Sequence, residues 1–273
     1  MKYESIELKE IYPCIVGGAL RIWCMDDPWG PLRKGVRPMV IVLPGGGYRG
    51  VSKSEADPIA AEFFAKGYQV CILEYLCSTQ GAHYPEQLYE LACAVDYIKR
   101  NAERLEVNPK EVFAVGFSAG GHLAADYASE HLTLPARTKA ALETGLAAVG
   151  LCYPVLDEHD ESFDNLLCGY SAEEKANLKE SLKLTTRVSA ANPPTFLWTT
   201  AEDRFVPAAN TLRYALALDK AGVPYELHVY PKGGHGMANG SLELNDNAEA
   251  ASVLSAWVRD MIRFFRSFCT EKF

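Results

Sequence analysis

Ser118 is the residue with the clearest chemical potential, at the centre of Gly116-Phe117-Ser118-Ala119-Gly120. A β-branched apolar run ends at Gly116 and an alanine-rich helical pattern begins at Ala119, which predicts a strand, a tight turn and a helix. Side chains two positions before and after the serine would collide in such a turn, so both must be glycine. The turn would expose the serine hydroxyl for nucleophilic attack, and the helix N-terminus would favour negative charge there. The alternative is a glycine-rich turn without chemistry.

A serine hydroxyl needs a general base, and His235 is the best placed of the six histidines. It lies in Gly233-Gly234-His235-Gly236, a loop after the last predicted core strand, where the glycines let the ring reach across the sheet edge. His122 falls in the helix after Ser118, where packing would surround its ring, and His228 falls inside a strand. We therefore expect His235 to be the base; the alternative is a loop imidazole exposed to solvent.

Asp203 is the candidate for the third member, which holds the histidine in one tautomer. It follows the predicted strand 195–200, and an acid in the turn after a strand can face the histidine loop. Glu202 is the nearest competitor, and a plain charge at a helix N-terminus is the other alternative.

A further glycine-rich segment, Pro44-Gly45-Gly46-Gly47-Tyr48, follows the predicted strand 39–43. We expect the amides of Gly46 or Gly47, together with that of Ala119, to form an oxyanion hole. A phosphate loop is the competing interpretation, but it requires a Gly-Lys-Ser/Thr ending that does not follow here. Residues that flank these predicted loops are candidates for the substrate pocket, with ordinary packing as the alternative: Tyr48, Tyr153, Phe205 and Met237.

Strands and helices must alternate to bring these residues together. Apolar runs predict strands, and 3.6-residue periodicity predicts helices between them. This alternation is typical of an α/β fold with a mostly parallel central sheet and helices on both faces. We expect one domain over residues 1–273, in which the polar stretch 157–189 is a small cap over the carboxyl edge of the sheet; an inert surface excursion is the alternative. The predicted strands are 20–25, 39–43, 70–73, 112–116, 147–153, 195–200 and 225–230, and the helices are 55–66, 85–104, 119–131, 172–183, 207–221 and 247–268.

Composition excludes several classes of function. The chain has 27 Lys and Arg against 35 Asp and Glu, a net charge of −8, so we expect no nucleic-acid or membrane partner. Eight cysteines form no C-x-x-C pair and no H-x-x-x-H is present, so no metal site is expected and the cysteines are interpreted as reduced core thiols. The first residues lack the apolar stretch of a signal peptide, which predicts a cytoplasmic location.

Together these motifs resemble the α/β-hydrolase superfamily, in particular bacterial acetyl-xylan-esterase-like carbohydrate esterases, a group related to hormone-sensitive-lipase-like esterases. The likeness runs from Leu20 to about Phe268. Pro44 stands where lipase-like members have His and Phe117 where they have Asp, which favours the carbohydrate-esterase branch. The motifs that carry the likeness are Pro44-Gly45-Gly46-Gly47-Tyr48, Gly116-Phe117-Ser118-Ala119-Gly120-Gly121, Asp203-Arg204-Phe205-Val206-Pro207 and His235-Gly236-Met237.

The resemblance implies a fold, an α/β-hydrolase, and an activity. The expected enzyme is a serine esterase that removes short acyl groups, above all acetyl, from a small ester, sugar or oligosaccharide through an acyl-serine intermediate, without a metal or cofactor. A general short-chain carboxylesterase without sugar preference and a non-catalytic binding module on the same fold are the alternatives. The aromatic side of the last predicted helix would also suit a homodimer; packing of the same side on the sheet is the alternative.

Overall fold

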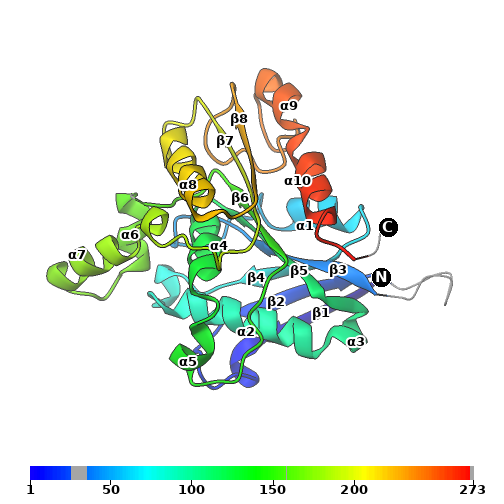
Figure 1. The fold of residues 1–273 in the computed structure, drawn as a ribbon, viewed down its shortest axis with the longest axis vertical. Coiled ribbons are helices and arrows are strands. Elements are labelled where there is room, and N and C mark those ends of the chain that lie inside the picture. Colours follow the sequence, from blue (N-terminus) through cyan, green and yellow to red (C-terminus); the bar gives the residue numbers. More distant parts are fainter. Residues whose placement is uncertain (26–35, 158, 271–273) are drawn as a thin grey trace.

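The computed structural model describes residues 1–25, 36–157 and 159–270, whose strands form one eight-stranded sheet (Figure 1). The strand order is β1-β2-β4-β3-β5-β6-β7-β8. β2 pairs antiparallel with β1 and β4, and the strands from β4 to β8 run parallel, as the alternation predicts. The strands are β1 (Lys2–Glu7), β2 (Ala19–Cys24), β3 (Arg37–Leu43), β4 (Gln69–Glu74), β5 (Val107–Phe117), β6 (Ala148–Cys152), β7 (Thr195–Thr200) and β8 (Tyr225–Tyr230).

Helices cover both faces of this sheet. α1, α9 and α10 pack on one face, and α2, α4 and α8 pack on the other. The continuous apolar run of β3 follows from this arrangement, because Val40 and Val42 face the first layer while Met39, Ile41 and Leu43 face the second. The helices are α1 (Asp57–Phe64), α2 (Glu86–Arg100), α3 (Ala102–Leu105), α4 (Ala119–Glu130), α5 (Leu134–Thr138), α6 (Asp160–Leu166), α7 (Ala172–Ser181), α8 (Ala208–Ala221), α9 (Ala248–Leu254) and α10 (Trp257–Arg266).

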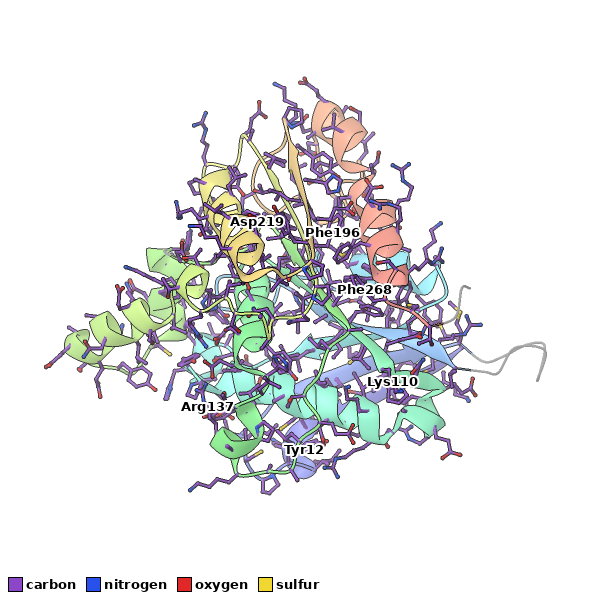
Figure 2. All side chains as sticks on the ribbon, in the orientation of Figure 1. Tyr12, Lys110, Arg137, Phe196, Asp219 and Phe268 are labelled. Carbon is purple, nitrogen blue, oxygen red and sulfur yellow. The ribbon has the colours of Figure 1, made fainter. Side chains whose placement is uncertain are left out.

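Aromatic contacts join the C-terminal helix to the sheet. Phe196 of β7 lies beside α10 (Figure 2), and its ring centroid is 5.9 Å from that of Phe264. Trp257 stacks on Trp198 with 5.2 Å between ring centroids, and its indole N–H donates to the Ala238 carbonyl. The aromatic side of α10 is therefore used for packing on the sheet, and the predicted homodimer is not tested by it.

The fold differs from the predicted elements at several places, and the short helices α5 and α6 are among the elements that were not predicted. β1 was not predicted, because its alternating charges lie on a half-exposed edge strand. The helix predicted over 85–104 is broken at Asn101, whose side chain donates to the Tyr97 carbonyl and ends α2. The helix predicted over 247–268 is divided into α9 and α10, separated at Ser255 and Ala256.

The polar stretch 157–189 forms α6, α7 and a 3₁₀ turn (Leu184–Thr186). α7 projects away from the sheet (Figure 1), whereas α6 lies next to the loop after β3, where Asn165 Nδ2 donates to the Gly47 carbonyl at 3.0 Å. The position agrees with the carboxyl edge expected for a cap; the capping role itself stays a prediction. Among the described residues, no helix has the length and apolarity needed to cross a bilayer.

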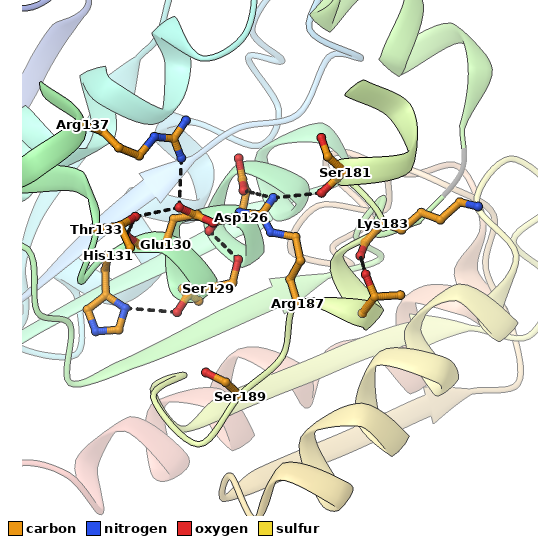
Figure 3. A network of polar contacts seen from close by, with 12 residues as sticks. Asp126, Ser129, Glu130, His131, Thr133, Arg137, Ser181, Lys183, Arg187 and Ser189 are labelled. Carbon is orange, nitrogen blue, oxygen red and sulfur yellow. Dashed lines mark hydrogen bonds and ion pairs between the residues drawn. The ribbon is translucent and has the colours of Figure 1, made fainter. Parts of the chain in front are cut away.

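Partly buried ion pairs attach the end of this stretch to α4 (Figure 3). Arg187 contacts Asp126 at 2.7 Å and Glu130 at 2.5 Å, and Glu130 also accepts from Arg137. Burial raises the pKa of Asp126 to about 6, although the nearby Arg187 guanidinium lowers it. The carboxylate and guanidinium are therefore interdependent, since either alone would be a buried charge.

We predict that Arg187→Ala lowers the free energy of unfolding by about 3 kcal/mol at pH 8, because it leaves the Asp126 carboxylate buried without its cation. Without Arg187 the pKa of Asp126 rises further, so the carboxyl takes up a proton as the pH falls and the loss is smaller at pH 5. Urea denaturation at both pH values measures this. Arg259→Ala, which removes an arginine whose side chain is 77% exposed, is the control and should change little. Equal losses at both pH values would contradict the assignment.

Candidate active site

Ser118 occupies the junction between β5 and α4 with a strained backbone, at φ 50° and ψ −115°. The neighbouring glycines are sterically required. A Cβ at Gly116 would lie 2.2 Å from the Gly120 oxygen, and a Cβ at Gly120 would lie 2.1 Å from the Leu43 oxygen. The strand, turn and helix predicted from the sequence are therefore present, and the glycines have the steric role expected of them.

His235 lies within hydrogen-bonding distance of both other predicted triad residues. Its Nε2 is 2.8 Å from Ser118 Oγ, and its Nδ1 is 2.7 Å from Asp203 Oδ2. Because an ionised carboxylate only accepts, Asp203 favours the tautomer with the proton on Nδ1, which leaves Nε2 to accept from the serine hydroxyl. The structure thus brings the three side chains together, although Ser118 lies 117 positions and Asp203 lies 32 positions before His235 in the sequence.

Asp203 is held rigidly. Its side chain is buried, and Oδ1 accepts the backbone N–H groups of Phe205 and Val206 at 2.9 and 2.8 Å. Glu202, the competing acid, instead pairs with Lys232 at 3.0 Å, and this bond lowers the pKa of the Glu202 carboxyl. The side chain that faces His235 is therefore that of Asp203.

The loop after β3 lies directly against the serine. A Cβ at Gly45 would lie 2.8 Å from the Phe117 carbonyl oxygen and 2.9 Å from the Ser118 Cβ, so a side chain at this position would collide with the serine turn. Gly46 and Gly47 have φ of 122° and 60°, values that glycine adopts without strain. The N–H groups of Gly46, Gly47 and Ala119 are not engaged by any acceptor among the described residues. These amides suit the predicted oxyanion hole, and that role stays a prediction.

The four residues predicted to line the pocket lie in two settings. Phe205 is 49% exposed, and its ring lies between His235 and His159, with centroid distances of 5.1 and 4.5 Å. Tyr48, Tyr153 and Met237 are buried. Contact of these four residues with substrate stays a prediction.

The Tyr48 hydroxyl lies 2.8 Å from Nδ1 of His122, which is buried in α4. Burial lowers the pKa of His122 to about 3, so its ring stays neutral at physiological pH. His122 therefore belongs to the packing, as its helical position predicts.

A cavity of about 360 Å³ opens beside this site in the predicted cap. The Phe205 ring lies against both His235 and His159, and His159 lines the cavity. The sequence predicts a cap with a surface helix over 172–183 in this stretch, but it does not predict a cavity or single out these positions as its lining. The lining residues are Asp157, His159, Phe163, Ala176, Lys179, Glu180 and Lys183.

A second residue that the sequence did not single out is Glu55, just before α1. Its carboxylate is buried and accepts hydrogen bonds from the Gly45 amide and the Tyr153 hydroxyl. In the sequence it stands at the start of an amphipathic helix, where an acidic residue is ordinary. No local signal could have connected it with a tyrosine 98 positions away.

Comparison with known proteins identifies the family of this chain. Residues 30–218 match the BD-FAE family, and this range includes Ser118 and Asp203. The chain belongs to the BD-FAE family. This BD-FAE chain is 30% identical over 209 residues to endo-1,4-β-xylanase B of Butyrivibrio fibrisolvens, and 26% identical over 209 residues to an acetylxylan esterase of Xylanibacter ruminicola. Each match covers 74% of this chain but only 32% and 41% of those relatives, so the chain spans less than half their length.

A solved structure shares the overall fold of this chain. The acetyl ester-xyloside bifunctional hydrolase of Caldicellulosiruptor lactoaceticus superposes with a TM-score of 0.80 at 28% identity. The alignment covers 97% of this BD-FAE chain and 96% of that protein. The resemblance inferred from the motifs is therefore confirmed, including the carbohydrate-esterase-like branch.

We predict that Gly120→Ala lowers the free energy of unfolding by about 3 kcal/mol, because the added methyl group would overlap the Leu43 carbonyl. Urea denaturation measures the loss. Gly50→Ala is the matched control, since a Cβ at Gly50 meets no atom within 4 Å, and its effect should be below about 0.5 kcal/mol. A Gly120→Ala protein as stable as the control would show that the close approach is not required.

Proposed function

We propose that this chain is a serine esterase that removes short acyl groups, above all acetyl, from a sugar or oligosaccharide. The observation that carries the proposal is the continuous hydrogen-bonded chain from Ser118 Oγ through His235 to Asp203. Beside it lie three backbone amides suited to an oxyanion. A buried acid, an oriented imidazole and a strained serine are the parts that acyl transfer requires.

In the first half of the proposed reaction, Ser118 Oγ attacks the ester carbonyl carbon while His235 Nε2 takes the hydroxyl proton. The carbonyl oxygen becomes an oxyanion, which the amides of Ala119 and of Gly46 or Gly47 stabilise. The tetrahedral intermediate collapses as His235 returns the proton to the departing alcohol, leaving an acyl-serine. Asp203 holds the imidazolium throughout.

In the second half, water replaces the alcohol. His235 takes a proton from the water as its oxygen attacks the acyl carbon, and a second tetrahedral intermediate forms at the same amides. Collapse of this intermediate returns the proton to Ser118 and releases the carboxylic acid. The cycle consumes one water and one ester, and yields one acid and one alcohol.

Support for a sugar as the alcohol comes from two sources. Relatives of this chain include an acetylxylan esterase and an acetyl ester-xyloside hydrolase. The cavity beside the site combines aromatic rings, His159 and Phe163, with charged side chains such as Asp157 and Lys179. Apolar ring faces with a few hydrogen-bonding groups suit a sugar, which presents both C–H and hydroxyl surfaces. A cytoplasmic location and a homodimer stay predictions from the sequence.

We expect Ser118→Ala to reduce hydrolysis of p-nitrophenyl acetate by about 10⁶-fold while the fold is retained, because the nucleophile is lost. Initial rates measure the activity, circular dichroism checks the fold, and a fluorophosphonate probe should label wild-type Ser118 only. Ser252→Ala, a change on the exposed surface of α9, is the control. A wild-type protein that the probe leaves unlabelled would instead support the non-catalytic binding module.

A substrate panel separates the sugar esterase from a general short-chain carboxylesterase. We expect acetate release from acetylated xylo-oligosaccharide at a kcat/KM above that for p-nitrophenyl butyrate or octanoate. Phe205→Ala should raise KM for the acetylated oligosaccharide about 10-fold and change KM for p-nitrophenyl acetate less, because the exposed ring would cover the sugar. Leu216→Ala on α8, which removes another half-exposed apolar side chain, is the control. Equal KM changes for both substrates would contradict a sugar-binding role for Phe205.

A further inference from the structure

Glu55 is a buried carboxylate beside the catalytic residues that the proposed reaction does not use. It is 3% exposed, and its two oxygens are engaged by different loops. Oε2 accepts from the Gly45 backbone N–H at 2.8 Å, and Oε1 accepts from the Tyr153 hydroxyl at 2.7 Å. Gly45 precedes the amides expected to bind the oxyanion, so this carboxylate holds one end of that loop.

Tyr153 extends the connection to the histidine loop. Its hydroxyl oxygen accepts the Ala238 backbone N–H at 2.9 Å, three residues after His235. Its ring packs against the imidazole, with 5.0 Å between centroids and an angle of 68°. Tyr153 has a φ of 38°, an uncommon value for a non-glycine residue that surrounding contacts must maintain. The chain Gly45–Glu55–Tyr153–Ala238 therefore links the two loops on opposite sides of Ser118.

We propose that Glu55 is a positioning residue that holds the oxyanion loop and the His235 loop in register through Tyr153, and whose negative charge favours the protonated imidazole formed during catalysis. The inference rests on the proposed esterase function and adds a second buried carboxylate to it. Asp203 contacts the imidazole directly, whereas Glu55 acts through backbone and tyrosine.

The hydrogen bonds of Glu55 fit a carboxylate, because both of its oxygens accept. Burial is the largest influence and raises the pKa of Glu55 above its ordinary value, although the Tyr153 hydroxyl, the Gly45 amide, the positive charge that His235 carries when protonated, and Ser52 each lower it. The other titratable groups that face it are Tyr75, Cys152 and Tyr153, and burial raises the pKa of each well above its ordinary value, so all three remain neutral. The carboxyl groups connected to His235 are therefore Asp203, by a direct hydrogen bond, and Glu55, through Tyr153.

Glu55→Gln tests both parts of the proposal. A carboxylate accepts from two donors, whereas the glutamine amide can accept from Gly45 but must donate toward Tyr153, whose hydroxyl proton then loses its acceptor. We expect kcat for p-nitrophenyl acetate to fall about 10-fold or more with KM changed by less than about 3-fold, since small misplacements of catalytic groups are costly. The acidic limb of the kcat/KM profile should move to lower pH by roughly 0.5 to 1 unit, because the charge favouring protonated His235 is gone.

Tyr153→Phe tests the two hydrogen bonds of the Tyr153 hydroxyl without replacing the Glu55 carboxyl group. It keeps the ring against His235 and the Glu55 carboxyl group but removes both hydrogen bonds, so kcat should fall while the acidic limb moves less than in Glu55→Gln. Glu90→Gln is the matched control, because Glu90 is equally buried and accepts from the Leu76 amide away from Ser118. Its kcat and pH profile should be those of the wild type, even if its stability falls.

The rate of Ser118 labelling by a fluorophosphonate distinguishes failure of this inference from failure of the proposed function. A wild-type protein that is not labelled overturns the esterase itself. A labelled wild type with equal labelling rates and pH profiles in Glu55→Gln overturns the role of Glu55. If Glu55→Gln does not fold, wild-type kcat in a folded Tyr153→Phe protein overturns the link between the loops.

Discussion

The close approach of three backbone segments at Ser118 is the constraint on which the rest of the site depends. Gly116 and Gly120 let the turn close on itself and on the end of β3, and this contact brings Ser118 to a φ of 50°. Such a conformation costs about 1 to 3 kcal/mol. The Ser118 amide donates to the Cys152 carbonyl, and the Ser118 carbonyl accepts from the Val155 amide, so the end of β6 and the segment after it stabilise the strained residue.

The strand order brings the other predicted catalytic residues close to Ser118. Because β3 and β5 are neighbours in a parallel pair, the glycine loop after β3 and the serine after β5 emerge side by side at one edge. Asp203 and His235 follow β7 and β8 at that same edge. Each loop is then fixed by its own bonds: Asp203 by two amides, and the histidine loop by Thr200, which donates to the Gly233 carbonyl.

The sequence was sufficient to predict the position of a site residue wherever the residues around it formed a recognisable local pattern. Ser118 has flanking glycines, Asp203 follows a strand, and His235 sits in a glycine-rich loop, so their positions could be predicted together with the parallel sheet. Glu55 could not, because its meaning lies in a contact with Tyr153 that only the folded chain creates. The end of α2 depends on the Asn101 side chain, and the existence of β1 depends on its pairing with β2 at the edge of the sheet. The periodicity of apolar residues in the sequence predicts neither feature.

The uneven attachment of the stretch 157–189 has an evolutionary consequence. Arg187 ties its end to α4 through buried charges, but α7 contributes no buried residue. Replacements at the exposed positions of α7 would therefore change the cavity that Ala176, Lys179 and Glu180 line, as long as Leu178, which packs against the core, is kept. Selection can act on the outer part of this stretch almost independently of the chemistry beneath it, which gives one scaffold a simple route to new substrates.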